Sequence, residues 1–175
     1  MNSTIADLIN RRSCRKFKAD AVPEDALKEI VLAGQYAPSG KGRQSTRMIV
    51  VTNKEMRDRI SDDNRKVGGW PEGFDPFYGA PAIIIVLADK SFPTSVYDAS
   101  LVLGNLMNAA HALGLGSIWI HRAKEEFEMG YYKELLKSLG IDGDFEGVGH
   151  CAIGYIDGGV NDAAPRMEDH VAYIK

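Results

Sequence analysis

The sequence is poor in cysteine and has no long uninterrupted run of apolar residues. Its two cysteines, Cys14 and Cys151, are too few for a disulfide framework and lack the spacing of a metal site, which favours reduced thiols. No apolar run reaches the length of a membrane span, and the first residues carry no export signal. We therefore expect a cytoplasmic protein that does not enter a membrane.

An excess of positive charge is also missing. The formal net charge is −3 and the pI is about 5.8, whereas nucleic-acid-binding domains usually carry a broad basic face. The four histidines share no i, i+4 pair, so no helix presents a ready metal site. These absences predict no nucleic-acid partner and no bound metal.

The apolar content suits one folded domain over residues 1–175, since 45% of the residues are hydrophobic. Hydrophobic periodicity predicts a first helix capped by Ser3 or Thr4, and later helices over 23–36, 54–60, 95–113 and 124–139. Short β-branched and apolar runs predict strands at 47–52, 82–88, 117–120 and 148–155, and an edge strand at 171–174, on this chain or on a partner subunit. Helices and strands mix without a regular βα repeat, which favours an α+β fold.

Two further segments are expected to be loops. Residues 38–42 are a run of chain breakers. Residues 61–79 are polar and contain glycine, but they also hold Trp70, Phe74, Phe77 and Tyr78. Long ordered loops are often functional, so these aromatic side chains either line a site or form a small satellite of the core.

The segment RRSCRKF, residues 11–17, places four cations within seven residues. Arginine forks match phosphate oxygens and Ser13 adds a hydroxyl, so Arg11, Arg12, Ser13 and Arg15 could converge on one phosphate dianion. In an extended segment, alternate residues such as Ser13 and Arg15 point the same way. Taken alone, the cluster is explained better by a solvated surface or by cations at the end of a helix dipole.

The order of several motifs along the chain supports the phosphate interpretation. Arg-Arg-Ser-x-Arg-x-Phe follows the first helix, and Ala37-Pro38-Ser39-Gly40 with Gln44 forms the next loop. Further motifs are FYGAP at 77–81, AAHALGLGSIWI at 109–120, AIGY at 152–155 and APR at 164–166. Together, and in this order, they resemble the nitroreductase family of flavin enzymes over nearly the whole chain. The length is similar to that of a short branch of the family.

This resemblance implies a nitroreductase-like fold, with a central mixed β-sheet flanked by helices, in an interlocked homodimer that holds FMN at two interface sites. It implies NADH or NADPH as electron donor and a small planar acceptor, such as a nitroaromatic or a quinone, in a ping-pong mechanism. Two alternatives stay open. One is a specialised flavin enzyme for dehalogenation or oxidative tailoring of a metabolite, and the other is a non-catalytic FMN-binding or redox-sensing module.

The resemblance also assigns site residues by position. The FMN phosphate would be held by Arg11, Arg12, Ser13, Arg15 and Arg166. The flavin would be lined by Pro38, Ser39, Gly40 and Gln44, with Asn64 as a candidate for its pyrimidine edge. The segment that presents a backbone N–H to flavin N5 would be Ile120, His121 and Arg122.

The chain departs from the family pattern at a few of these positions. Many relatives have glycine at His121, so this imidazole is a candidate proton donor to a reduced substrate, or else it packs at the rim of the site. Met167 stands where a second cation often follows Arg166, which leaves more of the phosphate binding to the N-terminal cluster. Cys14 lies among arginines, so it either has a lowered thiol pKa or is a bystander.

Overall fold

The computed structural model describes residues 1–175 and contains a four-stranded sheet in the order β1-β2-β4-β3. The strands are β1 (Thr46–Val51), β2 (Ala82–Asp89), β3 (Gly116–Ile120) and β4 (Phe145–Gly154). We expected a mixed sheet, but the chain reverses direction between each pair of neighbouring strands, so all three pairings are antiparallel. A parallel contact occurs only as an isolated bridge between Ser13 and Ser117. The α+β class is confirmed, and the mixed sheet is corrected to an antiparallel one.

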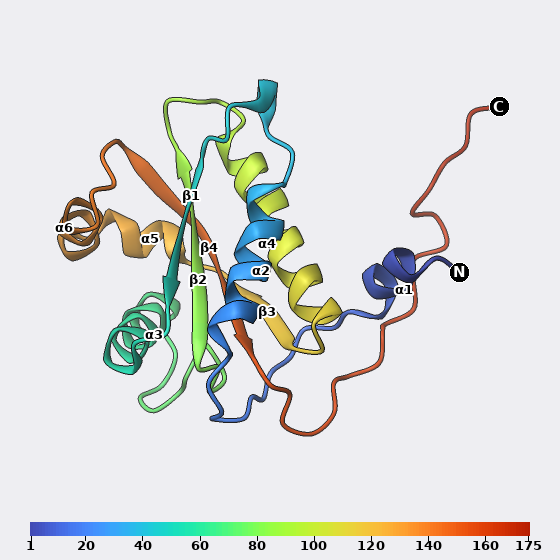
Figure 1. The fold of residues 1–175 in the computed structure, drawn as a ribbon, viewed down its shortest axis with the longest axis horizontal. Coiled ribbons are helices and arrows are strands. Elements are labelled where there is room, and N and C mark those ends of the chain that lie inside the picture. The colour runs from blue at the N-terminus through green and yellow to red at the C-terminus, as the bar shows by residue number, and fades with distance from the viewer.

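Helices cover both faces of the sheet (Figure 1). One face carries α2 (Glu24–Gln35) and α4 (Ser95–Ala112), and the other carries α3 (Lys54–Gly68), α5 (Ala123–Glu128) and α6 (Gly130–Ser138). Strand β2 can contact both layers because it is apolar on both faces, as the sequence predicts for a central strand. Its Ile83, Ile85 and Leu87 belong to the core under α3, α5 and α6, and the core under α2 and α4 receives Ile84, Val86 and Ala88.

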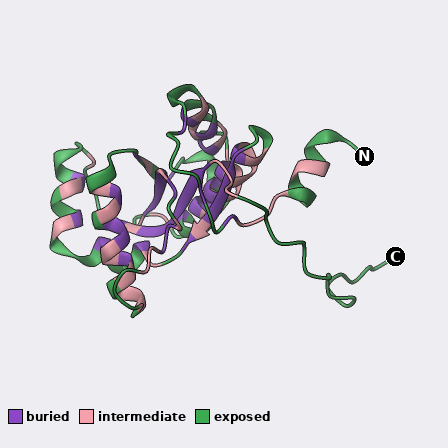
Figure 2. Cartoon of the chain, turned by 90° about the horizontal axis from the view of Figure 1, so that it is seen from below, coloured by how far each residue is buried: buried purple, intermediate pink, exposed green.

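Both ends of the chain stand away from this core. Helix α1 (Ser3–Asn10) has no buried residue, and the tail that follows β4 projects on the same side of the molecule (Figures 1 and 2). The helix cap is Asn2, not Ser3 or Thr4, because the Asn2 side chain accepts a hydrogen bond from Thr4 N at 2.9 Å. The tail forms no strand at 171–174 within this chain, so its pairing with a partner subunit stays a prediction.

Two of the expected helix boundaries are wrong. Helix α3 continues past residue 60 to Gly68, where Gly69 ends it in the left-handed conformation with φ 68°. The sequence pattern predicts a loop for the second half of α3 because polar residues, Ser61 and Asn64, occupy its buried face. The helix expected over 124–139 is broken into α5 and α6 by extended backbone at Met129. None of the helices is long and apolar enough to cross a membrane.

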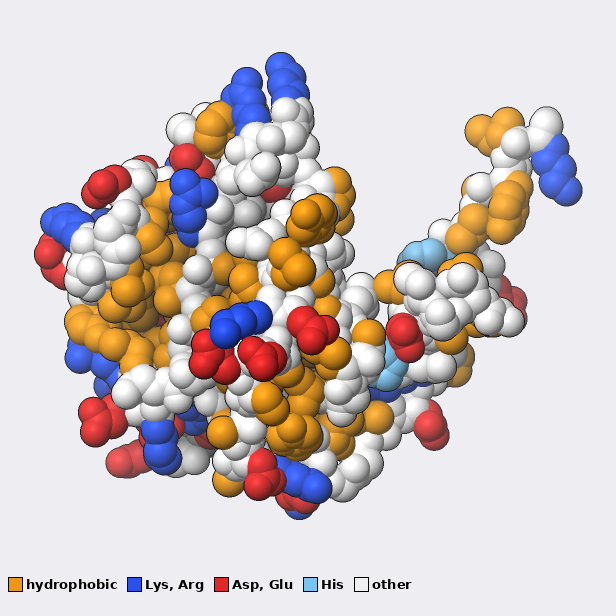
Figure 3. Space-filling view, viewed as in Figure 1, with side chains coloured by type: hydrophobic (Ala, Val, Ile, Leu, Met, Phe, Trp, Pro, Cys, Tyr) orange, Lys and Arg blue, Asp and Glu red, His pale blue; other side chains and the backbone are white.

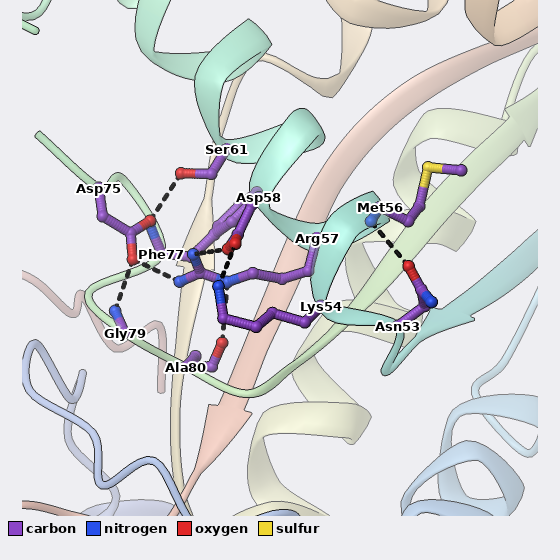
Figure 4. Close-up of polar contacts among 10 residues, drawn as sticks. All are labelled: Asn53, Lys54, Met56, Arg57, Asp58, Ser61, Asp75, Phe77, Gly79 and Ala80. Atoms are coloured by element: carbon purple, nitrogen blue, oxygen red, sulfur yellow. Dashed lines mark hydrogen bonds and ion pairs between the residues drawn. The ribbon is translucent and has the colours of Figure 1, made fainter. Parts of the chain in front are cut away.

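The shortened loop between α3 and β2 is held by the carboxylate of Asp75 (Figure 4). This carboxylate accepts hydrogen bonds from Ser61 Oγ at 2.6 Å, Phe77 N at 2.9 Å and Gly79 N at 2.7 Å, and it forms an ion pair with Arg57 Nη2. The guanidinium also donates from Nε to Ala80 O at 3.0 Å. Burial acts to raise the pKa of Asp75, but these hydrogen bonds outweigh it and the pKa is lowered.

The aromatic residues of this loop divide between the two interpretations left open above. Phe77 is fully buried and belongs to the core. Trp70, Phe74 and Tyr78 are only partly buried and form a row, with ring centroids 5.3 Å apart for the first pair and 6.0 Å for the second. The loop is therefore anchored by one core residue and presents a partly exposed aromatic row.

Candidate functional site

The RRSCRKF segment is extended and lies beside the edge strand β3. Cys14 N donates to Ser117 O at 3.0 Å, and Lys18 N donates to Tyr155 O at 2.9 Å. Cys14 and Phe17 face the core, whereas Lys16 is exposed and pairs with Asp157 at 2.8 Å. The extended backbone thus directs Cys14 and Phe17 into the core, and the arginine side chains do not help to fill it.

One cleft collects every residue that we expected to bind phosphate. Its volume is about 920 Å³, and we call it the arginine cleft; its lining includes Arg11, Arg12, Ser13, Arg15 and Arg166. None of these arginines forms an ion pair within the chain. Arg12 and Arg166 donate only to nearby carbonyl oxygens, and the buried Arg11 Nη1 has no hydrogen-bond partner. Four arginines that line one cleft without a carboxylate partner indicate that the cleft suits an anion.

The second expected set, residues 38–44, is held by a carboxylate that the sequence reading missed. Asp98 of α4 is 5% exposed and accepts hydrogen bonds from Gly40 N at 3.0 Å and Ser45 Oγ at 2.6 Å. Gly40 lies so close to α4 that an added Cβ would be 2.3 Å from Thr94 Oγ1. Within the loop, Ser39 Oγ accepts from Gln44 N at 2.9 Å. The signal that could have revealed Asp98 is its charge, which stands on the buried face of an otherwise apolar helix.

These two sets do not meet within one chain. Figure 1 places η1 (Gly40–Gly42) at one end of the α2–α4 layer and the RRSCRKF segment near the other end. The arginine cleft contains no residue from 38–44, and Gln44 instead lines a separate hollow of about 640 Å³ with Val31 and Tyr36. A ligand that touched both sets would therefore need a second copy of the chain.

The third expected set forms the turn between β3 and α5. Ile120 is buried at the end of β3, His121 is exposed, and Arg122 has a positive φ of 80°. The Arg122 guanidinium carbon lies 4.4 Å from the centre of the Trp70 ring. Asn64 is fully buried beneath the turn and donates from Nδ2 to His121 O at 2.8 Å. The structure therefore brings Asn64 to this turn, with its amide nitrogen bound to the protein.

The idea of an activated thiol at Cys14 is wrong. This side chain is 1% exposed, and burial raises the pKa of its thiol, although a hydrogen bond with the Lys16 backbone acts in the opposite direction. Burial likewise raises the pKa of Cys151 to about 12. Both thiols stay protonated at neutral pH and behave as small core residues.

Replacing Asp98 by alanine is expected to lower the free energy of unfolding by about 2 kcal/mol, because it leaves the Gly40 N–H and the buried Ser45 hydroxyl without an acceptor. Urea denaturation followed by circular dichroism measures this loss. Ser100→Ala is the matched control, since Ser100 is on the same helix but is only partly buried and its hydroxyl donates to Val96 O. Equal losses in the two variants would contradict a special role for Asp98.

Comparison with known proteins identifies relatives of the whole arrangement. The sequence model of the Nitroreductase family matches residues 8–68 and 70–155. A protein of Methanothermobacter thermautotrophicus, named as a candidate NADH dehydrogenase/NAD(P)H nitroreductase, is 35% identical over 113 residues, which are 62% of this chain and 56% of that protein. The FMN reductase (NAD(P)H) of Bacillus subtilis is 29% identical over 140 residues, 67% of this chain and 53% of that protein. The chain thus spans about half the length of these two relatives.

A solved structure matches this chain from end to end. The nitroreductase with bound FMN from Desulfitobacterium hafniense is 27% identical and has a TM-score of 0.88, with 100% of both chains covered. The family model covers both the arginine segment and the turn after β3. On this evidence the chain belongs to the nitroreductase family.

Proposed function

We propose that this chain is an FMN-dependent oxidoreductase built from one nitroreductase-like domain, residues 1–175. It passes electrons from NADH or NADPH to a small planar acceptor such as a nitroaromatic or a quinone. Family membership and the names of the relatives support this class of reaction and this cofactor. The single observation that carries the proposal is the arginine cleft, which is lined by four arginines that form no ion pair within the chain. A cytoplasmic location stays a prediction.

The arginine cleft fits the phosphate of FMN. A phosphate dianion supplies the negative charge that the arginines of the cleft lack, and Arg15 and Arg166 add positive charge at the rim. The Ser13 hydroxyl is a further donor in the same cleft. These groups bind the end of the cofactor that does not react, so their task is to hold and orient it.

The proposed enzyme is a homodimer in which each site is completed by the partner subunit. Within one chain, Ser39 and Gln44 lie apart from the arginine cleft, so the loop that lines the flavin is supplied by the second copy. Exposed apolar side chains support such an interface: Ile5, Leu8 and Ile9 of α1 are 50%, 52% and 53% exposed, and Tyr97 of α4 is 72% exposed. The projecting tail also carries hydrophobic side chains (Figure 3).

The turn after β3 serves the reacting end of the cofactor. Bound FMN supplies the hydride and electron transfer, while the protein supplies position and electrostatics. The Arg122 backbone N–H, which has no acceptor within the chain, donates to the flavin ring and fixes its place. The exposed His121 side chain can hold a proton at the mouth of the site and give it to a reduced acceptor.

The visible spectrum of the purified protein tests this function most directly. We expect a yellow protein whose absorbance near the flavin band is lost on adding NADH or NADPH without air, because the nicotinamide reduces the bound cofactor. Initial rates with a quinone acceptor should give parallel double-reciprocal lines, since both half-reactions use one site in turn. Intersecting lines would contradict the ping-pong mechanism, and a colourless protein that never takes up FMN would contradict the whole proposal.

The same experiment separates the alternatives. Absorbance that is lost with dithionite but with neither nicotinamide would indicate a redox-sensing module. Rapid reduction by a nicotinamide, followed by slow turnover with every simple nitro compound and quinone, would indicate a specialised flavin enzyme. Rapid turnover with several of these acceptors is the result that supports the proposed function.

A further inference from the structure

A buried polar cluster lies directly under the turn between β3 and α5. It consists of Asn64 from α3, Glu126 from α5 and His150 from β4, and all three residues are 0% exposed. We call it the polar triad. A carboxyl group and an imidazole cost free energy when they are removed from water, so their presence in the core needs compensating contacts or a function. Neither the arginine cleft nor the hollow beside the loop at 38–44 includes any of the three residues.

The contacts of the polar triad lead from the core to the turn. His150 Nε2 lies 2.8 Å from Glu126 Oε2, without the geometry of a hydrogen bond, and Asn64 Nδ2 donates to Glu126 Oε1 at 2.6 Å. Asn64 Nδ2 has a second hydrogen, which it donates to His121 O at 2.8 Å. The two acceptors determine which side of the Asn64 amide faces the turn. Glu126 therefore fixes Asn64, and Asn64 fixes the carbonyl of His121.

The fixed carbonyl determines the direction of the next N–H group. The peptide bond between His121 and Arg122 is planar and trans, so its C=O and its N–H point to opposite sides. Because Asn64 holds the C=O from within the core, the Arg122 N–H is directed away from the core. This N–H has no acceptor in the chain. Arg122 also has a φ of 80°, which is unfavourable for a residue with a side chain and needs support from neighbouring contacts.

We infer that Asn64, held by Glu126, is a positioning residue that directs the Arg122 N–H toward the bound flavin. The inference rests on the proposed function, because the flavin is the acceptor of that N–H. In this role Asn64 acts on the flavin through the backbone of the turn, and not by direct contact with the pyrimidine edge of the flavin ring. The stacking of Arg122 on Trp70 secures the same turn from the outside.

The test compares Asn64→Leu with Tyr132→Phe in the full-length protein. Tyr132 is a matched control because its hydroxyl donates to Asp63, the neighbour of Asn64 in α3, at 2.9 Å. This hydrogen bond does not involve the turn between β3 and α5. Without FMN, we expect backbone amides within 120–126 to exchange with deuterium about tenfold faster in Asn64→Leu and unchanged in the control. With FMN, we expect the rate of flavin reduction by a nicotinamide to fall about tenfold, the scale of one lost hydrogen bond, while FMN affinity stays within about twofold.

If Asn64→Leu does not fold, the double variant Asn64→Leu/Glu126→Leu takes its place, since replacing both polar partners is better tolerated than replacing one. It leaves His121 O without its donor and is expected to give the same slower reduction. Unchanged exchange at 120–126, or unchanged flavin reduction in a variant that binds FMN, would overturn the inference alone. A wild-type chain that binds no FMN would overturn the proposed function, and this inference with it.

Discussion

Arg11→Ala is expected to weaken FMN binding by about tenfold to hundredfold while leaving the protein folded. The variant removes a charge-assisted contact with the phosphate worth roughly 1.5–3 kcal/mol. Arg11 is the residue of choice because it lines the cleft, is only partly exposed and forms no ion pair within the chain, so water screens its interaction with an anion less than that of an exposed arginine. Arg15 is exposed, so we expect Arg15→Ala to lie at the lower end of this range. Titration of the apoprotein with FMN, followed by flavin fluorescence, measures both changes.

The cluster itself offers a matched control for this experiment. Lys16 is also a cation of RRSCRKF, but it points to solvent and pairs with Asp157 at 2.8 Å. Lys16→Ala should therefore leave FMN affinity unchanged. Tight FMN binding in the double variant Arg11→Ala/Arg15→Ala would contradict the role of these residues in binding the phosphate. An equal loss of FMN affinity in Lys16→Ala would show that only the overall positive charge of the segment matters.

Asp75→Ala is expected to give the largest loss of stability, about 3 kcal/mol in the free energy of unfolding. It leaves Nη2 of the Arg57 guanidinium, which is 10% exposed, without its carboxylate partner, and it removes the acceptor of Ser61 and of two backbone N–H groups. Asp58→Ala is the control, because Asp58 also contacts Arg57, at 3.0 Å, but is 44% exposed. Its loss should stay below about 1 kcal/mol. Urea denaturation measures the free energy of unfolding of both variants. Equal losses in the two would contradict the larger contribution that we assign to Asp75.

The lowered pKa of Asp75 gives this stability a direction with pH. In the unfolded chain the pKa of an aspartate is about 3.9, and the folded protein holds the pKa of Asp75 below its usual value. Its contribution is therefore complete above the unfolded pKa and is lost as the pH falls through the folded one. We expect the free energy of unfolding to fall between about pH 5 and pH 3, and to fall less steeply in Asp75→Asn. Parallel pH profiles for the two proteins would contradict this assignment.

Much of the fold follows from the apolar pattern of the sequence. Residues 82–88 are apolar on both faces of their strand, and the structure places this strand in the middle of the sheet with helices on each side. The pattern fails where polar side chains turn inward. Ser61 and Asn64 hide the second half of α3 because their partners, Asp75 and His121, are distant in the sequence.

The candidate site also divides into residues that local sequence patterns identify and residues that only the fold brings together. Short motifs identify the residues of the arginine cleft, because Arg11, Ser13 and Arg15 are close neighbours in the chain. No local pattern reveals that residues 38–44 lie elsewhere, since this depends on the position of α4 and the bond from Gly40 to Asp98. Glu126 and His150 were missed for a similar reason. Each looks like an isolated polar residue until the fold brings Glu126 against Asn64 and His150 against Glu126.

The pairing of the RRSCRKF segment with β3 has a consequence beyond cofactor binding. Strand β3 is an outer strand of the sheet, and a bare outer strand invites pairing with another chain, which leads to aggregation. The bridge at Ser13–Ser117 covers part of that margin, the bridge at Phe17–Ile156 continues the contact just beyond β4, and the cations beside them add charge. The residues proposed to hold the phosphate therefore also protect the sheet. A substitution in this stretch can therefore lower solubility as well as cofactor binding, even where the fold of the rest of the chain is unchanged.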